Sequence, residues 1–342
     1  MTVTLEAPSL GYTKKDFVSD QDVRWCPGCG DYAILAQIQK VMPELGIPKE
    51  KIVFVSGIGC SSRFPYYMDT YGFHTIHGRA PAIATGLRLA RKDLSIWVVT
   101  GDGDGLSIGG NHLIHVLRRN VGLKILMFNN KIYGLTKGQF SPTSERGQVT
   151  KSSPSGSVAM PFSAPFLALG AQASFVARSI DTDANHLQQM IRRVAQHSGT
   201  AFLEIFQNCP VFNDGAFEGL RDRARKSDEL LELEHGQPLV YGQSRDRVIR
   251  LDPKTQALYS GYVGQQDGGV ELIHDERSAS PVVASLLAQH PAPGMPTPIG
   301  VFRAIDAPTF ESQTWQQSEA EIARRGPGTL EQLLDAGDRW EL

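Results

Sequence analysis

A buried strand that runs directly into a glycine-rich turn constrains the fold of this chain more than any other feature. Residues 95–100 (SIWVVT) are apolar and rich in β-branched side chains, and the sequence GDGDG follows at 101–105. A helical pattern covers 107–120, and a second apolar run, LKILMFNN, occupies 123–130. A strand, a helix and a strand in this order predict a right-handed βαβ unit in a parallel sheet.

The same alternation extends over most of the first 230 residues. Strands are predicted at 52–56, 95–100, 123–130, 173–178 and 201–206, and helices at 81–92, 107–120 and 183–197. We therefore expect an α/β fold whose mostly parallel sheet is covered by helices on both faces. Residues 138–160 are rich in Ser, Gly, Thr and Pro and predict a long loop. The alternation weakens after about residue 215, which predicts a boundary between a domain at 1–230 and a C-terminal extension at 231–342.

Composition and charge exclude several classes of function. The 342 residues carry a formal net charge of -2, which gives no reason to expect nucleic acid or a membrane surface as a partner. The N-terminal residues lack the apolar core of a secretion signal. No stretch approaches the roughly 18 consecutive apolar residues that span a bilayer. We therefore expect a cytoplasmic protein, whose thiols stay reduced.

The acids in the glycine-rich turn point to a bound cation. Glycine lets the backbone approach a ligand, and a helix N-terminus offers N–H groups to phosphate oxygens. Asp102 and Asp104 would repel a bare phosphate, but Mg²⁺ between a carboxylate and a diphosphate removes this conflict. The pair Asn129-Asn130 begins 26 residues after Gly103 and ends the next strand, so it reaches the same edge of the sheet. The Asn130 side-chain oxygen and a main-chain carbonyl just beyond it would complete the coordination.

This turn has two other interpretations. A nicotinamide site is not favoured, because the spacing is not G-x-G-x-x-G and two acids would repel a pyrophosphate. A tight turn and an asparagine pair without any ligand is the other alternative. The pattern of GDG and NN resembles the signature of the thiamine-diphosphate enzymes. By that resemblance Asp102, Asn130 and the carbonyl of Ile132 hold Mg²⁺.

Four cysteines lie in turn-like surroundings outside the apolar runs. Cys26 and Cys29 form a CxxC turn, Cys60 follows the first strand, and Cys209 follows the last clear strand. Four thiolates hold either zinc or a [4Fe–4S] cluster, although a zinc ribbon has two CxxC pairs. The sequence WCPGC also resembles a redox dithiol, but the residues before Trp25 are polar and do not form the strand that such a dithiol needs. From the residues alone, four interpretations of the cysteines stay open: an iron–sulfur cluster, a zinc site, a redox dithiol and thiols without a shared function.

A series of motifs resembles the β subunit of the 2-oxoacid:ferredoxin oxidoreductases. The motifs, in order between residues 24 and 215, are CPGCG, GIGCSS, HxxHGRA, GDGD, NNxIYGLTKGQ and NCP. The resemblance implies one [4Fe–4S] cluster, held by Cys26, Cys29, Cys60 and Cys209. It implies contacts to thiamine diphosphate from Ile58, Gly59, Cys60, Ser61, His77, Gly78, Arg79 and Ala80. It implies contacts near the diphosphate end from Gly103, Asp104, Gly134 and Leu135. Helix capping and packing is the alternative role for the HGRA stretch.

Two residues are candidates for catalysis or substrate selection. His77 is placed beside the cofactor by the resemblance, and Arg63 follows Cys60 by three residues. The segment YGLTKGQFSPT is more similar to the 2-oxoglutarate branch of the family than to the pyruvate branch. Arg63 would then pair with the second carboxylate of the substrate, because a guanidinium binds a carboxylate through two parallel hydrogen bonds. A surface arginine without this role is the alternative.

The resemblance also implies that this chain is one subunit of a larger enzyme. The expected reaction converts 2-oxoglutarate and coenzyme A to succinyl-CoA and CO₂, or runs in the carboxylating direction, and the cluster passes electrons to ferredoxin. In this family a separate α subunit supplies the glutamate that activates thiamine, and no glutamate here has a convincing context. We therefore expect an α2β2 assembly with the active site at a subunit interface. The alternatives are the same chemistry on pyruvate or another 2-oxoacid, a non-redox thiamine enzyme with structural zinc, and a non-enzymatic cysteine–metal module.

Overall fold

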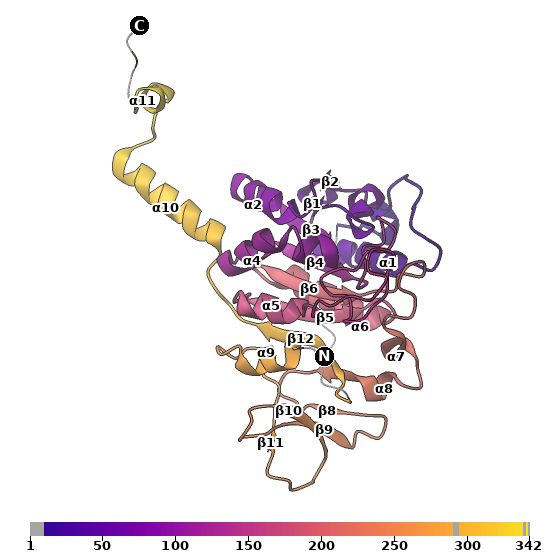
Figure 1. The fold of residues 1–342 in the computed structure, drawn as a ribbon. Helices are drawn as coiled ribbons and strands as arrows, with labels where there is room; N and C mark the ends of the chain where they lie inside the picture. The colour runs from indigo at the N-terminus through magenta and orange to yellow at the C-terminus, as the bar shows by residue number, and fades with distance from the viewer. Residues whose placement is uncertain (1–9, 290–293, 338–339, 341–342) are drawn as a thin grey trace.

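An eight-stranded sheet forms the centre of the computed structural model, which describes residues 10–289, 294–337 and 340. The strand order is β2-β1-β3-β4-β6-β5-β12-β7 (Figure 1). The strands are β1 (Ile52–Ser56), β2 (Tyr71–His74), β3 (Ser95–Gly101), β4 (Lys124–Asn129), β5 (Phe175–Ile180), β6 (Ala201–Phe206), β7 (Leu230–Leu233) and β12 (Thr297–Ala304). Neighbouring strands run parallel except β5 and β12. The expected mostly parallel sheet is confirmed.

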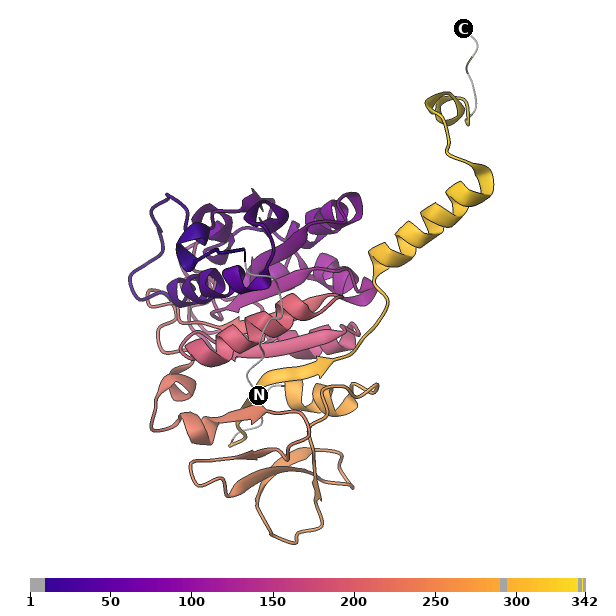
Figure 2. The ribbon, with the colours of Figure 1, turned by 180° about the vertical axis from the view of Figure 1, so that it is seen from behind.

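Helices cover both faces of this sheet (Figures 1 and 2). Successive strand residues point to opposite faces, so Ile96 and Val98 enter one core while Trp97 and Val99 enter the other. The first core is covered by α2 (Ala80–Ala90), α4 (Gly110–Arg119), α5 (Ala164–Gly170) and α9 (Val282–Ala288). The second core is covered by α1 (Asp31–Val41) and α6 (Ala184–Gln196). Because both faces are buried, β3 is apolar along most of its length rather than alternating with polar residues.

The glycine-rich turn differs from the prediction in one respect. Residues Asp102–Leu106 form a short helix, α3, inside the predicted turn. The predicted helix follows as a separate element, α4. Helix α3 fits there because its glycines carry no side chain. A Cβ on Gly103 would lie 2.2 Å from the ring of Tyr133. The loop predicted at 138–160 is confirmed, since it contains no helix or strand apart from isolated bridges.

The segment after residue 230 is only partly separate from the rest of the chain. Its strands β7 and β12 belong to the main sheet, beyond β5. Between them lies a four-stranded sheet, made of β8 (Val240–Tyr241), β9 (Arg247–Leu251), β10 (Leu258–Tyr262) and β11 (Val270–Glu271). Short helices α7 (Glu218–Arg221) and α8 (Lys226–Glu229) precede it. The predicted boundary near 230 therefore coincides with the start of a strand of the main sheet.

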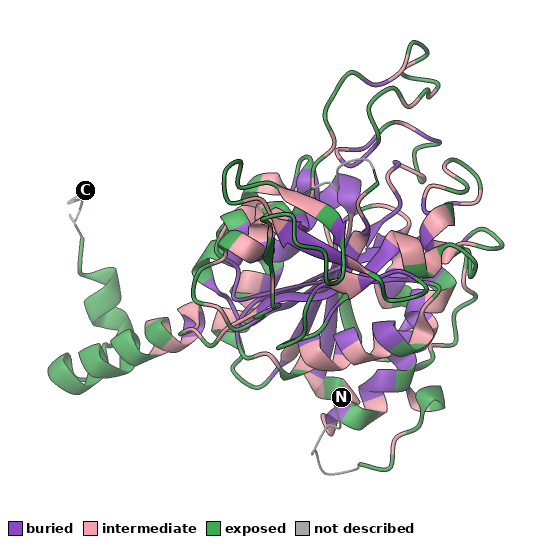
Figure 3. Cartoon of the chain, turned by 90° about the horizontal axis from the view of Figure 1, so that it is seen from below, coloured by how far each residue is buried: buried purple, intermediate pink, exposed green. Residues whose placement is uncertain are grey.

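The chain ends in an arm that leaves the body of the molecule. It consists of α10 (Phe310–Arg325) and α11 (Leu330–Leu334), and it extends away from the sheet in Figures 1 and 3. The residues from 316 to 337 are all exposed. No helix in the described part of the chain is long and apolar enough to cross a membrane. The residues at 1–9, where no secretion signal is expected, lie outside the described residues.

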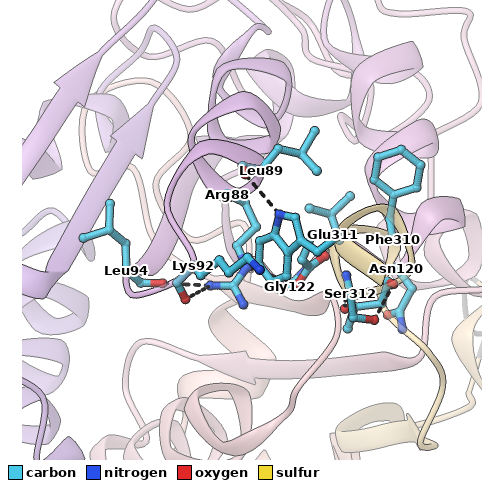
Figure 4. A network of polar contacts seen from close by, with 12 residues as sticks. Arg88, Leu89, Lys92, Leu94, Asn120, Gly122, Phe310, Glu311 and Ser312 are labelled. Carbon is cyan, nitrogen blue, oxygen red and sulfur yellow. Dashed lines mark hydrogen bonds and ion pairs between the residues drawn. The ribbon is translucent and has the colours of Figure 1, made fainter. Parts of the chain in front are cut away.

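A buried carboxylate fixes the root of this arm (Figure 4). Glu311 accepts hydrogen bonds from Arg88 Nε at 3.1 Å and from the Gly122 N–H at 3.2 and 3.1 Å, one to each carboxylate oxygen. A Cβ on Gly122 would lie 2.4 Å from Glu311 Oε1, so only glycine permits this approach. Trp315 donates to the Leu89 carbonyl at 3.1 Å. The start of α10 is therefore held in one direction.

Replacing Glu311 by alanine should loosen the root without unfolding the sheet. The change removes the acceptor of Arg88 Nε and of the Gly122 N–H, while Arg88 Nη1 keeps the carbonyls of Lys92 and Leu94, and we expect a cost of about 3 kcal/mol. Amides in the first half of α10 should then exchange hydrogen roughly a hundredfold faster. The control is Glu319→Gln, which removes only the exposed ion pair with Lys92 and should change exchange less than about fivefold. Equal effects of the two changes would contradict the role given to Glu311.

Candidate cofactor and metal site

The loops after four neighbouring strands meet at the carboxyl edge of the sheet. They follow β1, β3, β4 and β6, which run parallel to their neighbours. The loops enclose a cavity of about 150 Å³. Its lining includes Ile58, Gly59, Cys60, Ser61, His77, Asp102, Gly103, Asp104, Asn130, Ile132, Gly134 and Leu135. Most of the residues predicted to hold thiamine diphosphate and Mg²⁺ therefore surround one space.

Asp102 has the environment of a metal ligand. Its carboxylate is buried, and Oδ2 accepts hydrogen bonds from Ser141 Oγ at 2.5 Å and Thr143 Oγ1 at 2.6 Å. Burial raises the pKa of Asp102 to about 6, against the effect of the two hydroxyl donors. A nearby cation would offset this cost, and oxygen donors from Asp102, Asn130 and Ile132 are the ligand type that Mg²⁺ prefers. The donor set therefore fits the ion.

The asparagine pair shapes its own turn. The side-chain oxygen of Asn129 accepts the Lys131 N–H at 3.0 Å, and that of Asn130 accepts the Ile132 N–H at 3.2 Å. Lys131 adopts a φ of 55°, which is uncommon for a residue with a side chain. Asn129 also donates to Glu204 at 2.8 Å, so a buried carboxylate holds the first asparagine while the second lines the cavity. The two asparagines therefore have different functions.

Asp104 connects the loops instead of facing a ligand with a free carboxylate. Its Oδ1 accepts hydrogen bonds from His77 Nδ1 at 2.5 Å, the Gly78 N–H at 2.7 Å and the Ile58 N–H at 3.1 Å. Its Oδ2 accepts one from Thr100 Oγ1 at 2.6 Å. A Cβ on Gly57 would lie 2.0 Å from this carboxylate. Asp104 thus ties the loop after β1 and the turn before α2 to the end of β3.

The HGRA stretch divides between the cavity and the fold. His77 lines the cavity, and its ring stands edge-on to Tyr133 at 6.3 Å between centroids. Gly78, Arg79 and Ala80 are not among the lining residues. Arg79 donates to the His77 carbonyl at 3.1 Å and precedes α2, while Ala80 is buried in the first core. These last two residues therefore belong to the start of α2 and its packing, which is the alternative role given above for the HGRA stretch.

The four cysteines line a second cavity of about 230 Å³. It shares a wall with the first cavity, formed by Cys60, Asn130, Gly134 and Leu135. A Cβ on Gly134 would lie 3.5 Å from the sulfurs of both Cys60 and Cys209. Gly134 therefore allows the backbone of the NN turn to pass beside two of the four thiols. The two predicted centres are adjacent.

Two of the four thiols need positive charge to ionise in this position. Burial raises the pKa of Cys60 to about 12 and also raises the pKa of Cys29, and the nearby Asp31 carboxylate adds to both shifts. Iron ions would supply the missing charge. In the described part of the chain, no three His, Cys, Asp or Glu side chains gather closely enough for a single metal ion. Four thiolates are a donor set that both an iron–sulfur cluster and a zinc ion can take.

Arg63 lies in the cysteine cavity and not in the cofactor cavity. It belongs to the 3-10 helix Ser61–Tyr67, whose first turn places the Arg63 N–H 3.2 Å from the Cys60 carbonyl. Arg24 and Lys137 line the same cavity, and no described Asp or Glu does. The Arg63 backbone is thus held next to Cys60, one of the residues of the shared wall.

Some residues of the site were not foreseen from the sequence. Ser141 and Thr143 come from the 138–160 loop and donate to Asp102, although their spacing from it carries no local signal. Gln207 lines the cofactor cavity, and its Oε1 lies 4.0 Å from Cys29 Sγ. In the sequence, the position of Gln207 between β6 and Cys209 was the feature that indicated its place in the site. No described glutamate lines either cavity.

Comparison with protein families agrees with this site. Residues 57–205 match the family model described as the thiamine pyrophosphate enzyme, C-terminal TPP binding domain. The match begins just after β1 and ends in β6, so it contains the GDG turn and the asparagine pair. Cys26, Cys29 and Cys209 lie outside it.

Individual relatives extend the likeness beyond that domain. The 2-oxoglutarate oxidoreductase subunit KorB of Mycobacterium tuberculosis is 51% identical over 98% of this chain and 90% of its own length. The β subunit of 2-oxoacid:ferredoxin oxidoreductase 1 from Aeropyrum pernix is 43% identical over 60% of this chain and 65% of its own. A solved structure of 2-oxoglutarate:ferredoxin oxidoreductase from Magnetococcus marinus, with 2-oxoglutarate, coenzyme A and succinyl-CoA bound, matches with a TM-score of 0.76 and 31% identity, over 98% of this chain and all of that one. This chain belongs to the β-subunit family of the 2-oxoacid:ferredoxin oxidoreductases, and within it to the 2-oxoglutarate branch.

Proposed function

We propose that this chain is the β subunit of a cytoplasmic 2-oxoglutarate:ferredoxin oxidoreductase that binds Mg²⁺-thiamine diphosphate and one [4Fe–4S] cluster. The enzyme would convert 2-oxoglutarate and coenzyme A to succinyl-CoA and CO₂, or catalyse the reverse carboxylation. The names of the M. tuberculosis and M. marinus relatives support this substrate. The observation that carries the proposal is the wall shared by the two cavities. The cofactor cavity and the cavity lined by the four cysteines have residues in common, so the two sites are adjacent.

The residues of this chain would have distinct functions. Asp102, Asn130 and the Ile132 carbonyl would hold Mg²⁺ against the diphosphate, and Asp104 would position His77 beside the ligand. When bound, thiamine diphosphate supplies the decarboxylation chemistry and an iron–sulfur cluster carries single electrons. The four cysteines would hold that cluster next to the cofactor, so that electrons leave toward ferredoxin.

A partner subunit completes the proposed active site. Thiamine needs a carboxylic acid against its aminopyrimidine ring, and no described glutamate lines the cofactor cavity. The β-subunit naming of the relatives supports an α partner that supplies it. Two apolar side chains that line the cavity, Ile58 (37% exposed) and Leu135 (49%), would be covered by that partner. We propose an α2β2 assembly.

Anaerobic purification of the chain with its α subunit tests the proposal. A broad absorbance near 400 nm that dithionite bleaches is expected of an iron–sulfur cluster. The complex should reduce a viologen or ferredoxin with 2-oxoglutarate and coenzyme A. A colourless complex that binds thiamine diphosphate would instead indicate the non-redox alternative, and a complex that lacks both properties would indicate the cysteine–metal module.

Arg63 is the proposed partner of the second substrate carboxylate. Arg63→Ala should reduce kcat/KM for 2-oxoglutarate by roughly a hundredfold, because a charge-assisted bidentate pair contributes about 3 kcal/mol. The smaller rate with pyruvate, which has no second carboxylate, should change little. Arg24→Ala is the control, since it removes a cation from the same cavity that already pairs with Asp22. Equal losses on both substrates would remove Arg63 from substrate selection.

Asp102→Ala should abolish Mg²⁺-dependent binding of thiamine diphosphate and leave the cluster absorbance unchanged. Titration calorimetry with and without Mg²⁺ measures the first effect. In the unchanged protein, cofactor binding should weaken as the pH falls through about 6, because the Asp102 carboxyl with its raised pKa then takes up a proton. Unchanged affinity in the variant would refute the assignment.

Asp104→Ala tests the connection between the loops. It leaves four donors without their acceptor, two of them the backbone N–H groups of Ile58 and Gly78. Leaving a buried donor unpaired costs about 1–3 kcal/mol, so the affinity for thiamine diphosphate should fall at least tenfold. Asp104→Asn keeps one carbonyl oxygen and should lose less. The same affinity in all three proteins would show that the loops do not depend on this carboxylate.

A further inference from the structure

One asparagine fastens the turn of the fourth cysteine to the expected metal site. Asn213 lies four residues after Cys209, and its N–H donates to the Cys209 carbonyl at 3.0 Å. The side chain of Asn213 points the other way, and its Nδ2 donates to the Asn130 carbonyl at 2.8 Å. Cys209 lines the cysteine cavity, while Asn130 lines both cavities. Asn213 itself lines neither, so it acts on a ligand only through its neighbours.

The peptide that Asn213 holds sets the direction of an expected Mg²⁺ ligand. The Asn130 carbonyl belongs to the peptide just before Lys131, and the Ile132 carbonyl follows just after that residue. Lys131 has a φ of 55°, a left-handed conformation that a residue with a side chain keeps only where other contacts enforce it. Rotation of the peptide before Lys131 would therefore redirect the Ile132 carbonyl.

Few contacts from outside the NN turn hold this peptide in place. Ser144 donates to the Lys131 carbonyl at 2.6 Å, from the 138–160 loop. The Asn130 carbonyl has its hydrogen bond from Asn213, and the described residues contain no second donor to it. The orientation of the Asn130 peptide therefore depends on where Asn213 lies.

The position of Asn213 depends in turn on the segment that carries Cys209. The N–H of Gly30, beside the CxxC turn, donates to the Asn208 carbonyl at 3.1 Å. The side chain of Asn208 is buried and accepts the Gly215 N–H at 3.0 Å, which closes the segment 208–215. These contacts hold the two ends of the segment. A cluster bound to Cys209 and the other three cysteines would restrict the segment further, and Asn213 with it.

We propose that Asn213 is a positioning residue that couples the two centres, so that an occupied cysteine site strengthens the binding of Mg²⁺-thiamine diphosphate. The coupling runs from Cys209 through Asn213 to the Asn130 peptide. Coupling between binding sites is reciprocal, so bound cofactor strengthens the retention of the cluster by the same factor. The inference rests on the proposed function for the identity of the two ligands, and it adds a residue that contacts neither.

The two ends of the Asn213 amide allow this route to be separated from a second one. Its Oδ1 accepts a hydrogen bond from Gln148 Nε2 at 3.1 Å, and the loop that contains Gln148 also reaches Asp102. Asn213→Asp keeps the acceptor for Gln148 but places a carboxylate oxygen against the Asn130 carbonyl. Gln148→Ala removes the loop contact and leaves the contact with Asn130. The backbone bond to Cys209 stays in both variants.

Titration calorimetry with Mg²⁺-thiamine diphosphate measures the coupling in the αβ complex. The affinity is determined with the cluster present and again after a chelator has removed the iron under oxidising conditions. We expect the affinity to be roughly tenfold lower without the cluster, within the usual range of coupling between sites. In Asn213→Asp the two affinities should differ by less than about twofold, whereas Gln148→Ala should keep the roughly tenfold ratio.

This ratio distinguishes coupling from a merely structural contribution. A residue that only stabilised the fold would lower both affinities and leave their ratio unchanged, and that result would overturn the proposal. Asn213→Ala, which introduces no carboxylate, is the second variant and should also bring the ratio close to one. A ratio that Gln148→Ala removes and both Asn213 variants keep would likewise overturn the assigned route.

The rate of cluster loss gives a second measurement on the complex as purified. The absorbance at about 400 nm is followed after a chelator is added, with and without Mg²⁺-thiamine diphosphate. Bound cofactor should slow the loss at least about fivefold in the unchanged complex and in Gln148→Ala, but not in Asn213→Asp. Equal slowing in all three would overturn the proposal, because the cofactor would then protect the cluster without Asn213.

The outcomes also separate this inference from the proposed function. Equal affinities with and without the cluster, in a complex that oxidises 2-oxoglutarate, would overturn the coupling alone. A ratio that both Asn213 variants remove, in a complex that oxidises no 2-oxoacid, would support the coupling and contradict the proposed activity.

Discussion

The buried carboxylate of Asp104 is the contact on which the arrangement of the site depends. It accepts hydrogen bonds from His77, from the backbone of Gly78 and Ile58, and from Thr100. These donors come from the loop after β1, from the turn after β2 and from the end of β3 itself. A carboxylate accepts more hydrogen bonds than any other side chain of its size, so no neutral residue would join the three equally well. Its neighbour in the turn, Asp102, is left to face the cavity. The two acids of the GDGDG sequence therefore divide structural and ligand-binding functions.

The site concentrates negative groups at one edge of the sheet. Asp102 is buried, Asp31 is buried beside Cys29 with a pKa raised to about 7 by desolvation, and two of the four thiols have strongly raised pKa values. Such groups are costly without positive charge close by. The described lining of the cofactor cavity contains no Lys or Arg, whereas Arg24, Arg63 and Lys137 line the cysteine cavity. A cation beside Asp102 would lower the cost of burying its carboxylate, and positive charge beside Cys29 and Cys60 would lower the cost of ionising their thiols.

The sequence predicted the sheet better than it predicted the site. Buried strands such as 95–100 and 123–130 have one strong local signal, hydrophobicity over a short run, and the structure has strands β3 and β4 there. The convergence of Cys60 and Asn130 could also be foreseen, because both follow parallel strands. The hydrogen bonds of Ser141 and Thr143 to Asp102 could not, since they depend on how a long loop folds back. The function of Asp104 was missed for a similar reason, because an acid that gathers backbone N–H groups looks the same in sequence as one that binds metal.

The root of the arm lies at the amino-terminal ends of β3 and β4, away from the two cavities. The root at that edge is specific. Arg88 and Lys124 bring two cations to the same place, and burial lowers the pKa of Lys124 to about 8, so the Glu311 carboxylate is needed to balance them. The contacts of the Glu311 carboxylate therefore fix the direction in which α10 leaves the sheet.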